Sequence, residues 1–483
     1  MKSLNLKLQD SKKPKYERIY KAFLDGLKEG VLKPGERLPS TRELAKTYRC
    51  HRLTVMNALQ SLVAEGWLES QEKSHYFVSQ KTPITSPVGL RKTKKKKPQF
   101  HLTKPSYSLV QERARHKIEF WGGQPDMRLF PLDEFRLVLS EALRRVKPQL
   151  LNYGSMDGLD VFKVQVEEYF RRTRFLTDKK YLITNGSQEG VQLIAQALLQ
   201  PGDRVVVEAK GYTPVWKLLE NLGLVLVPVS VDEEGLDTTK LEKIITQKKI
   251  KMIYVTPHHQ YPTTVTLSPR RRQHLIQLAE THHVPILEDD YDHEFHYLSP
   301  PQTPLAAQSD YAIYIASFSK IVFPGSRLGV IACHESLHEA LAEQKFLTSR
   351  QNESLSQLAL AMWMKEGGFE KHLRRVTRIY EKRFSFMQAE LEKLKAEHDI
   401  EWIQPSGGMC YWVDIKCNSR LVAEEASKLG VFFQNEKNVD FEKQDGTHLR
   451  IGFACVTEEE IKIGFEILHK VLKSKSPRAR LGK

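Results

Sequence analysis

A lysine stands directly after a strand-like run in the segment YIASFSKIVFPGSRLG, residues 314–329. This lysine, Lys320, can condense with an aldehyde if it is partly desolvated, because desolvation lowers the pKa of the amine and leaves it nucleophilic near neutral pH. Arg327 offers paired planar donors that suit a phosphate, and Ser317 and Ser319 add hydroxyl donors. The motif S-x-S-K is weak by itself, because a lysine after a strand is more often a surface residue. Partners elsewhere in the chain must therefore support the assignment of a Schiff-base lysine.

A candidate anion ends the run VPILED, residues 284–289. A Schiff-base cofactor with a pyridine ring needs an anion at the ring nitrogen, since the protonated ring acts as an electron sink. Asp289 can be that anion, and Tyr291 can hydrogen-bond the oxygen substituent of the same ring. The adjacent Asp290 is an alternative that the sequence leaves open.

A phosphate site is predicted in the segment ITNGSQEGVQLIAQALL, residues 183–199, where a Gly-Ser-Gln turn begins a long helix. Free backbone N–H groups and the helix dipole favour an anion at such a start, so Gly186, Ser187 and Gln188 are the candidate residues. Tyr212, at the exit of the next strand in VVVEAKGYTP, can stack on the cofactor ring. Core packing is the alternative interpretation of this tyrosine.

These residues lie in a long region where short Val/Ile-rich runs alternate with helical patterns. The strand-like runs are 205–208, 251–256, 284–289 and 311–317, and the stretch SPRRRQHLIQLAETHH between two of them is typical of a helix. Such alternation predicts a parallel α/β sheet, and no repeat period is evident.

The charge of the chain is concentrated at its N-terminal end. Residues 1–100 contain 22 Lys and Arg against 9 Asp and Glu, whereas the other 383 residues contain 52 and 50. A basic module beside a nearly neutral body indicates a polyanion partner, although the Lys94–Lys97 run alone is also consistent with a solvated stretch. The mixture of Pro, Ser, Thr and Lys in residues 81–115 is typical of a linker. We therefore expect domains at 1–80 and 116–483, joined by a basic linker at 81–115.

The basic module has the pattern of three helices and a hairpin. Apolar residues at helical spacing from Tyr16 to Leu27 precede a Pro-Gly turn, and Ser40 with Glu43 forms a capping box that begins a second helix. Residues 48–50 are the expected turn before a third helix that ends at Gly66. Residues 67–79 are expected to form two short strands, a wing with Lys73, Ser74 and His75 near its tip. A helical hairpin used for dimerisation is the alternative.

The run PGERLPSTRELAKTYRCHRLTVMNALQSLVAEGWL closely resembles the GntR-type winged helix. The resemblance implies binding to double-stranded DNA, with Ser40, Thr41 and Arg42 at the duplex backbone. It places Arg52 and Thr54 at the start of the recognition helix, where an arginine can donate two hydrogen bonds to guanine. His51 stands where the family usually has a serine, and the wing lacks the usual glycine-rich tip.

The region from 118 to 470 resembles the fold-type I aminotransferases, and the whole chain resembles the MocR/GabR family of regulators. The matches are FWGGQPDMRLFP (120–131), YGSMDGLDVFK (153–163), TNGSQEG (184–190), TPHHQYPT (256–263), LEDDYDHEF (287–295), SFSK (317–320), PGSRLG (324–329) and LRIGFA (449–454). The resemblance implies an α+β winged helix-turn-helix domain followed by an α/β fold-type I domain with a smaller C-terminal α/β subdomain. It also implies a homodimer and the cofactor pyridoxal 5'-phosphate.

The resemblance assigns a role to each candidate residue. Lys320 carries the cofactor as an internal aldimine, Asp289 pairs with the pyridinium, Tyr291 binds the 3-oxygen and Tyr212 stacks on the ring. Ser317 and Arg327 bind the phosphate, Tyr153 reaches the phosphate of the neighbouring subunit, and Arg450 takes the α-carboxylate of an amino-acid ligand.

The sequence departs from ordinary aminotransferases at two places. Tyr261-Pro262-Thr263-Thr264 replaces N-P-T-G, so the ring-oxygen asparagine and a glycine are absent, although an aromatic residue is common there in the regulator family. Lys210 replaces a proline often found in E-x-P-G-Y, and we expect it to be a plain surface residue.

Cysteine spacing and hydropathy limit the remaining possibilities. The five cysteines are scattered without any C-x-x-C pair, which indicates a reducing compartment and no metal site. No apolar leader or membrane-spanning run is present in the sequence, so we expect a cytoplasmic protein without membrane contact.

Three functions are consistent with these features. The first is a transcription regulator that senses an amine or amino acid, or the cofactor itself, at Lys320. The second is a catalytically competent aminotransferase with an attached DNA-binding module. The third is a DNA-binding protein whose large domain is only a dimer scaffold, and the full set of cofactor residues argues against it. The basic winged helix favours the first function, because an enzyme does not need it.

Overall fold

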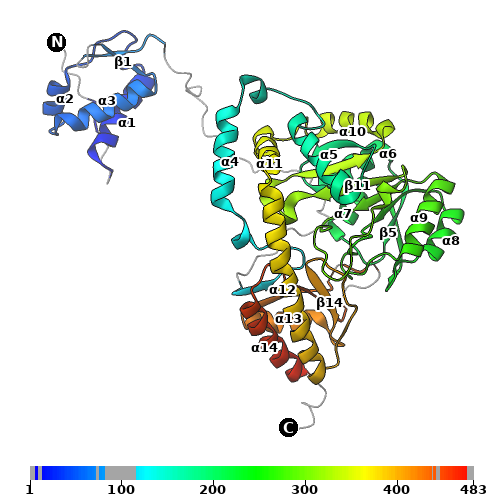
Figure 1. The fold of residues 1–483 in the computed structure, drawn as a ribbon. Coiled ribbons are helices and arrows are strands. Elements are labelled where there is room, and N and C mark those ends of the chain that lie inside the picture. Colours follow the sequence, from blue (N-terminus) through cyan, green and yellow to red (C-terminus); the bar gives the residue numbers. More distant parts are fainter. Residues whose placement is uncertain are drawn as a thin grey trace. The chain divides into compact units, whose positions relative to one another are not determined.

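The computed structural model describes residues 6–8, 13–71, 75–81, 116–437, 439–441 and 446–475. The chain divides into two compact units, residues 1–103 and 104–483 (Figure 1). The predicted linker 81–115, apart from residue 81, lies outside the described residues, as do Lys73 and Ser74 at the expected wing tip. The expected domain boundaries therefore stay a prediction. None of the described helices is long and apolar enough to cross a membrane.

The first unit contains the three helices and the hairpin that the sequence predicts. Its elements are α1 (Lys15–Lys28), α2 (Thr41–Thr47), α3 (Arg52–Ala64), β1 (Leu68–Gln71) and β2 (His75–Val78). The two strands pair antiparallel. One buried cluster, with Phe23, Leu59 and Trp67 among its members, joins the helices to the hairpin.

Local interactions fix the boundaries of the second and third helices. The capping box at α2 is formed: the Glu43 amide donates to Ser40 Oγ at 3.2 Å, and the Ser40 amide donates to the Glu43 carboxylate at 2.8 Å. Arg49, in the turn between the helices, adopts a left-handed φ of 47°. His51 takes the place of the usual serine cap, because its Nδ1 accepts the Leu53 N–H at 3.3 Å.

The second unit contains a seven-stranded sheet in the order β4-β12-β11-β10-β9-β5-β6. The strands are β4 (Lys180–Thr184), β5 (Arg204–Glu208), β6 (Val225–Val229), β9 (Ile250–Val255), β10 (Ile286–Asp289), β11 (Ala312–Ser317) and β12 (Gly329–Cys333). The four predicted strands are confirmed. The sheet is mixed rather than fully parallel, because β12 runs antiparallel to both of its neighbours. The connection from β11 to β12, residues 318–328, is too short for the crossover that a parallel pair needs.

Helices cover both faces of this sheet (Figure 1). They are α4 (Leu132–Arg145), α5 (Asp160–Arg174), α6 (Ser187–Leu198), α7 (Thr213–Asn221), α8 (Thr238–Gln247), α9 (Pro269–His282), α10 (Glu335–Thr348) and α11 (Ser354–Lys365). Successive strand residues point to opposite faces. Accordingly, Ile286 belongs to the buried cluster with α5, α8, α9 and α11, whereas Leu287 belongs to the cluster with α6, α7 and α10. This alternation decides which face each site residue reaches.

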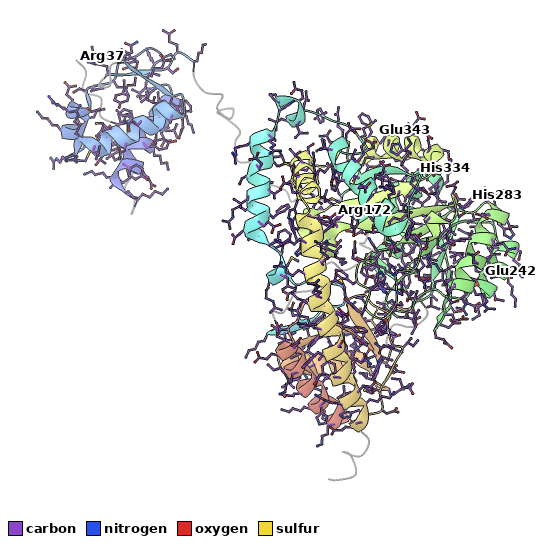
Figure 2. All side chains as sticks on the ribbon, in the orientation of Figure 1. Arg37, Arg172, Glu242, His283, His334 and Glu343 are labelled. Atoms are coloured by element: carbon purple, nitrogen blue, oxygen red, sulfur yellow. The ribbon has the colours of Figure 1, made fainter. Side chains whose placement is uncertain are left out.

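A five-stranded sheet in the order β13-β14-β16-β15-β3 forms the smaller subdomain. Its elements are β3 (Ile118–Phe120), α12 (Gly368–Glu397), β13 (Glu401–Trp402), β14 (Cys410–Asp414), α13 (Ser419–Lys428), β15 (Val431–Asn435), β16 (His448–Gly452) and α14 (Glu458–Lys475). Strand β3 comes from the start of the unit and pairs parallel with β15. The ion pair of Arg172 on α5 with Glu370 on α12, at 3.0 Å, links the two parts of the unit (Arg172 is labelled in Figure 2).

Among the described residues of the second unit, the remaining short elements are two strands and five 3-10 turns. They are β7 (Val231–Asp232), β8 (Gly235–Leu236), η1 (Met127–Leu129), η2 (Pro148–Leu151), η3 (Leu305–Ala307), η4 (Phe318–Lys320) and η5 (Pro324–Ser326). The last two lie between β11 and β12, so they place Lys320 and Arg327 beside the ends of adjacent central strands.

Candidate functional site

Lys320 is the last residue of η4, directly after β11. Burial and the positive charge of Arg450 lower the pKa of its amine to about 8, while Asp292 and Asp289 oppose this shift. A Cβ built on Gly123 would lie 4.0 Å from the Lys320 Nζ, so the amine lies against this stretch of backbone. The lysine is therefore desolvated in the way that nucleophilic attack on an aldehyde requires.

Asp289 and Asp290 point to opposite faces of the sheet and have different partners. Tyr254 on β9 donates its hydroxyl to Asp289 Oδ2 at 2.8 Å, and the other carboxylate oxygen is buried with no partner among the described residues. Asp290 instead forms an ion pair with the buried Arg174 and accepts the Tyr314 hydroxyl at 2.9 Å. Burial raises the pKa of Asp289 to about 6, whereas the Arg174 cation holds the pKa of Asp290 below its usual range.

The start of α6 faces the end of the β11–β12 connection. Gly186 is the N-cap with a φ of 84°, and Ser187 is the first residue of the helix. The Arg327 guanidinium donates to the Asn185 carbonyl at 2.6 Å, and a Cβ on Gly186 would come within 2.8 Å of it. Helical N–H groups at a helix start, an exposed guanidinium and a glycine that keeps the approach open could together hold an anion. Gln188 lies in the same first turn and is exposed.

Three further candidates, Ser317, Tyr291 and Tyr212, have partners of their own. Ser317 caps η4, accepting the Ser319 amide at 3.3 Å and donating to the Ser319 hydroxyl at 2.9 Å. The Tyr291 hydroxyl donates to the His259 carbonyl at 2.8 Å. Tyr212 keeps 37% of its surface exposed and meets Tyr261 edge to face at a centroid distance of 5.2 Å. Core packing is therefore not the role of Tyr212.

Arg450 on β16 brings a buried guanidinium to the lysine. It is 1% exposed, donates to the Gly122 carbonyl and lies 4.5 Å from the centre of the Tyr261 ring. Its Nε has no partner in the part of the chain that the structure describes. A Cβ on Gly122 would overlap Nη1, so only glycine leaves room for the arginine there. The site is thus closed on one side by the small subdomain.

Tyr153 lies apart from these contacts. Its side chain is 70% exposed, and the Arg350 guanidinium covers its ring at 3.8 Å. An exposed position of this kind is compatible with the expected contact to a neighbouring subunit.

Several neighbours of the site were not predicted to be site residues, although Tyr261 was noted as a departure from N-P-T-G. They are Tyr254, which holds Asp289; Tyr261 and Gly122, which hold Arg450; and Gln434, which donates to the Tyr261 hydroxyl at 2.9 Å. Tyr261 and Gly122 lie inside the matched motifs TPHHQYPT and FWGGQPDMRLFP, so the motifs could have indicated both residues as candidates. Tyr254 lies on the adjacent parallel strand opposite Leu287, which is two residues before Asp289 and on the same face, and a pairing of these two strands was needed to find it.

The loop that lacks N-P-T-G still forms a tight turn. The Gln260 Oε1 accepts the Thr263 hydroxyl at 2.6 Å and the Thr263 amide at 3.1 Å. Thr264, in place of the glycine, adopts a φ of 64°, a conformation that costs a residue with a Cβ about 1–2 kcal/mol. The turn therefore forms with local backbone strain at Thr264.

Lys210 is not a plain surface residue, and that expectation was wrong. Its Nζ lies 2.9 Å from the buried Glu436 carboxylate and 3.8 Å from Asp440. Lys210 also forms an isolated backbone bridge with Asp440. The lysine thus fastens the Tyr212 loop to the small subdomain, a contact between distant segments that local sequence does not reveal.

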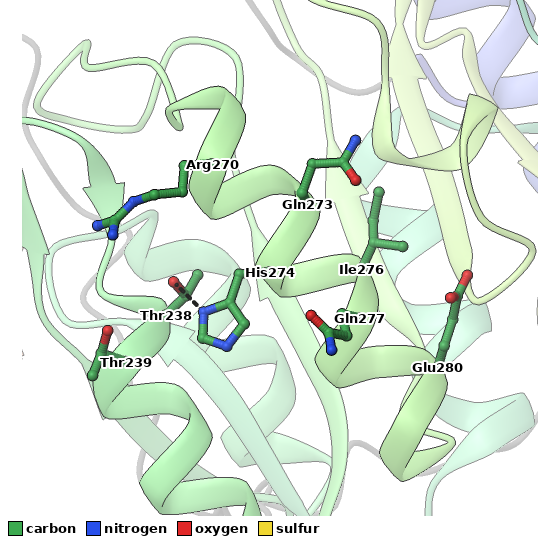
Figure 3. Close-up of a pocket in the computed structure, with 8 residues that line it drawn as sticks. All are labelled: Thr238, Thr239, Arg270, Gln273, His274, Ile276, Gln277 and Glu280. Atoms are coloured by element: carbon green, nitrogen blue, oxygen red, sulfur yellow. Dashed lines mark hydrogen bonds between the residues drawn. The ribbon is translucent and has the colours of Figure 1, made fainter.

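A separate pocket of about 610 Å³ lies between α8 and α9 (Figure 3). Its lining residues are Thr238, Thr239, Arg270, Gln273, His274, Ile276, Gln277 and Glu280. The one hydrogen bond drawn there, between His274 Nδ1 and the Thr238 hydroxyl, is 3.0 Å long and joins the two helices. None of these residues belongs to the Lys320 site.

The candidate DNA-binding residues lie around the start of α3. Arg42 and Arg52 are exposed, and Thr54 is partly buried. Thr41 is only 3% exposed, and its hydroxyl accepts the Arg52 Nε–H at 3.0 Å. Its side chain therefore orients Arg52, and the expected contact of Thr41 with the duplex backbone stays a prediction. Ser40 is likewise engaged in the capping box.

Two family models match the chain. Residues 15–78 match "Bacterial regulatory proteins, gntR family", and residues 123–468 match "Aminotransferase class I and II". The second match spans well over half of the 483 residues. The chain belongs to the class I and II aminotransferase family. It differs from a bare aminotransferase of that family by its GntR-type winged helix.

Curated relatives and a solved structure agree with this assignment. The probable rhizopine catabolism regulatory protein MocR of Rhizobium meliloti is 29% identical over 82% of this chain and 80% of its own length. The HTH-type transcriptional regulator YdfD of Bacillus subtilis is 25% identical over 97% and 98%. LysN, an α-aminoadipate aminotransferase of Thermus thermophilus, solved with N-(5'-phosphopyridoxyl)-L-leucine, aligns with a TM-score of 0.67 and 26% identity over 74% of this chain and 92% of its own.

The cofactor of this family member is pyridoxal phosphate, and the second unit fits it. The unpaired Asp289 oxygen, the desolvated Lys320 amine and the glycine-lined start of α6 beside Arg327 are the groups that a pyridine nitrogen, an aldehyde and a phosphate require.

Proposed function

We propose that this protein is a pyridoxal-phosphate-dependent transcription regulator that binds double-stranded DNA through its first unit and an amine or amino acid at Lys320. One observation carries the proposal: a GntR-type winged helix and a site equipped for pyridoxal phosphate occur in the same chain. An enzyme needs only the second of these.

The cofactor would be held by contacts at three places. Arg327, Ser317 and the first turn of α6, from Gly186 to Gln188, would bind the phosphate. Asp289 would keep the pyridine nitrogen protonated, because its unpaired oxygen is buried on the face that α6 covers. Lys320 would bind the aldehyde carbon, and Tyr212 would stack on the ring. When bound, the cofactor supplies an electrophilic carbon that reacts with amines.

Tyr291 would reach the 3-oxygen of the ring by redirecting its hydroxyl from the His259 carbonyl. Arg450 would bind the carboxylate of an amino-acid effector, because it is a buried cation beside the lysine with an Nε that has no protein partner among the described residues. Tyr153 would contact the phosphate of a second subunit, so the active form would be a homodimer.

On DNA, Arg52 would read bases at the start of α3, supported by Thr54, while Arg42 and the Ser40 turn would contact the backbone. Thr41 would act through Arg52, which it orients with its hydroxyl. Binding of an effector at Lys320 would change how strongly the winged helices bind the operator.

The test is footprinting on the DNA upstream of the protein's own gene, with and without pyridoxal phosphate and a panel of amines. We expect protection that an effector alters, and we expect Lys320→Ala to remove the effector response. Arg52→Ala should weaken promoter binding by about 1–3 kcal/mol and leave the visible band of the bound cofactor unchanged. Equal affinity of the unaltered protein for promoter and random DNA would contradict the proposal.

A second candidate function is transamination, favoured by the combination of a low-pKa lysine with a buried carboxylate-binding arginine. Incubation with an amino acid and a keto acid distinguishes the two functions. Sustained conversion at many turnovers per site would support an enzyme, whereas at most one turnover per site would support a sensor.

A further inference from the structure

Three histidine side chains come together in the second unit. His258 and His259 follow the end of β9, and His296 follows β10 in the neighbouring connection. One ring nitrogen from each lies within 4.8 Å of the other two. His258 and His259 are 3% and 2% exposed, and His296 is partly buried. Imidazoles are rarely gathered in the interior unless they have partners.

In two of the rings one nitrogen is already bonded to the protein, so only the other nitrogen of each ring can bind an ion. His259 Nδ1 lies 2.7 Å from the buried carboxylate of Asp292, and its Nε2 is buried without a partner in the described part of the chain. His296 Nε2 is bonded to the His293 carbonyl, which leaves its Nδ1 for the cluster. This is the arrangement of histidine metal ligands, which donate their second N–H to a carboxylate or a carbonyl.

The third ring completes the cluster. His258 Nε2 lies 3.4 Å from His296 Nδ1, which is long for a hydrogen bond between two nitrogens. Two nitrogens bound tetrahedrally to one Zn²⁺ at about 2.0–2.1 Å lie about 3.4 Å apart. Because the three nitrogens lie within 4.8 Å of one another, a side-chain movement of up to about 1.4 Å would bring the His259 nitrogen to the same distance.

A cavity of about 190 Å³ reaches two of the three rings and gives an ion a path to solvent. Both His258 and His296 line it, together with polar residues such as Thr266, Gln302 and Ser406. The fourth position of a tetrahedral ion would face this cavity, where water can occupy it.

We propose that His258, His259 and His296 bind one transition-metal dication of the Zn²⁺ class, with Asp292 as the outer carboxylate that orients His259. Three imidazoles without a carboxylate ligand favour such an ion over Mg²⁺ or Ca²⁺, which prefer oxygen ligands. The expectation of no metal site rested on cysteine spacing, whereas these ligands come from two separate strand ends. The site is distinct from the pyridoxal phosphate contacts but shares their wall, because the His259 carbonyl accepts the Tyr291 hydroxyl.

The test uses the full chain without an affinity tag, stripped with a chelator and then titrated with Co²⁺. We expect one Co²⁺ per chain, with the visible absorption of tetrahedral cobalt at longer wavelength than the cofactor band, and displacement by Zn²⁺. His258→Gln and His296→Gln should each weaken Co²⁺ binding by at least about tenfold, and Asp292→Asn by about 10–100-fold.

Two matched controls separate the cluster from other histidines. His283 is exposed on the surface (labelled in Figure 2), so His283→Asn should leave Co²⁺ binding unchanged. His398 and His469 form a pair at 3.0 Å that no third histidine of the described residues joins, so His398→Gln should also have no effect. The fold of every variant is checked by its cofactor band and thermal unfolding. Failure of the unaltered chain to bind Co²⁺ stoichiometrically, or equal binding by folded His258→Gln and His296→Gln variants, would overturn the proposal.

Discussion

Lys320 shows how a single environment sets the chemistry of a residue. Its pKa is lowered from 10.5 to about 8, mainly by burial and then by the charge of Arg450. Only the neutral amine attacks an aldehyde, so the rate at which cofactor-free protein captures pyridoxal phosphate should rise with pH and level off above about pH 8. Stopped-flow growth of the visible band measures this profile.

A variant of Arg450 tests how much its positive charge contributes to the lowered pKa of Lys320. Arg450→Met removes a positive charge near the amine, so the midpoint of the capture profile should move to higher pH. A profile of the unaltered protein that still rises towards pH 10.5, or a midpoint unmoved by Arg450→Met, would contradict the assignment.

Replacement of Asp289 and of Asp290 by asparagine should have different effects on the free energy of unfolding. The pKa of Asp289 is raised to about 6, so its ionised form costs stability above that pH, and Asp289→Asn should leave the free energy of unfolding at pH 8 unchanged or higher. The pKa of Asp290 is lowered by Arg174, so its ionised form stabilises the fold above its unfolded pKa of about 4. Asp290→Asn should cost about 3–5 kcal/mol, because Arg174 would stay buried and unpaired.

Denaturant unfolding of the cofactor-free variants at pH 8 measures this difference. The comparison depends only on the sign of the change in the free energy of unfolding of each variant. Similar destabilisation by both substitutions would show that the two carboxylates are not distinguished by their partners as described.

At the scale of elements, the start of α6 depends on a glycine for two separate reasons. Gly186 has a φ of 84°, and a Cβ there would lie 2.8 Å from the Arg327 guanidinium. Gly186→Ala should therefore weaken pyridoxal phosphate binding at least about tenfold, through displaced Arg327 as well as strain, when measured by equilibrium titration of the visible band.

Gly202 provides the matched control for backbone strain. Its φ is 93°, but a Cβ there would meet nothing within 4 Å. Gly202→Ala should lower stability by about 1–2 kcal/mol and leave cofactor affinity unchanged. An equal loss of affinity in both variants would mean that the contact with Arg327 is unimportant.

At the scale of the whole molecule, DNA binding and cofactor binding should separate physically. The two compact units divide the chain at 103/104, and most of the excess positive charge lies in residues 1–100. A fragment of residues 116–483 should keep the visible cofactor band and lose DNA binding. The full chain should bind DNA with an affinity that falls steeply with salt, because phosphate contacts release counterions.

Fluorescence anisotropy with labelled promoter DNA, measured over a range of salt concentrations, checks both expectations. DNA binding retained by the 116–483 fragment would place the DNA-binding site in the second unit and would contradict the proposal. Loss of the cofactor band from a folded fragment would show that the first unit contributes to the cofactor site.

The sequence by itself determined the features that depend on neighbours along the chain. The capping box at Ser40 and Glu43, the strand at 311–317 and the Gly186 turn were predictable, because each is specified by residues within a few positions of one another. The motifs then supplied Lys320, Asp289, Arg327 and Arg450 as candidates.

Only the tertiary structure decided the features that depend on which faces and strand ends meet. It separated Asp289 from Asp290, because the face of β10 that α6 covers is a property of the folded sheet. It paired Thr41 on α2 with Arg52 on α3, and Lys210 with Glu436, which lies 226 residues away in sequence. It also brought His296 to His258 and His259, because β9 and β10 are neighbouring parallel strands whose carboxyl ends lie at the same edge of the sheet.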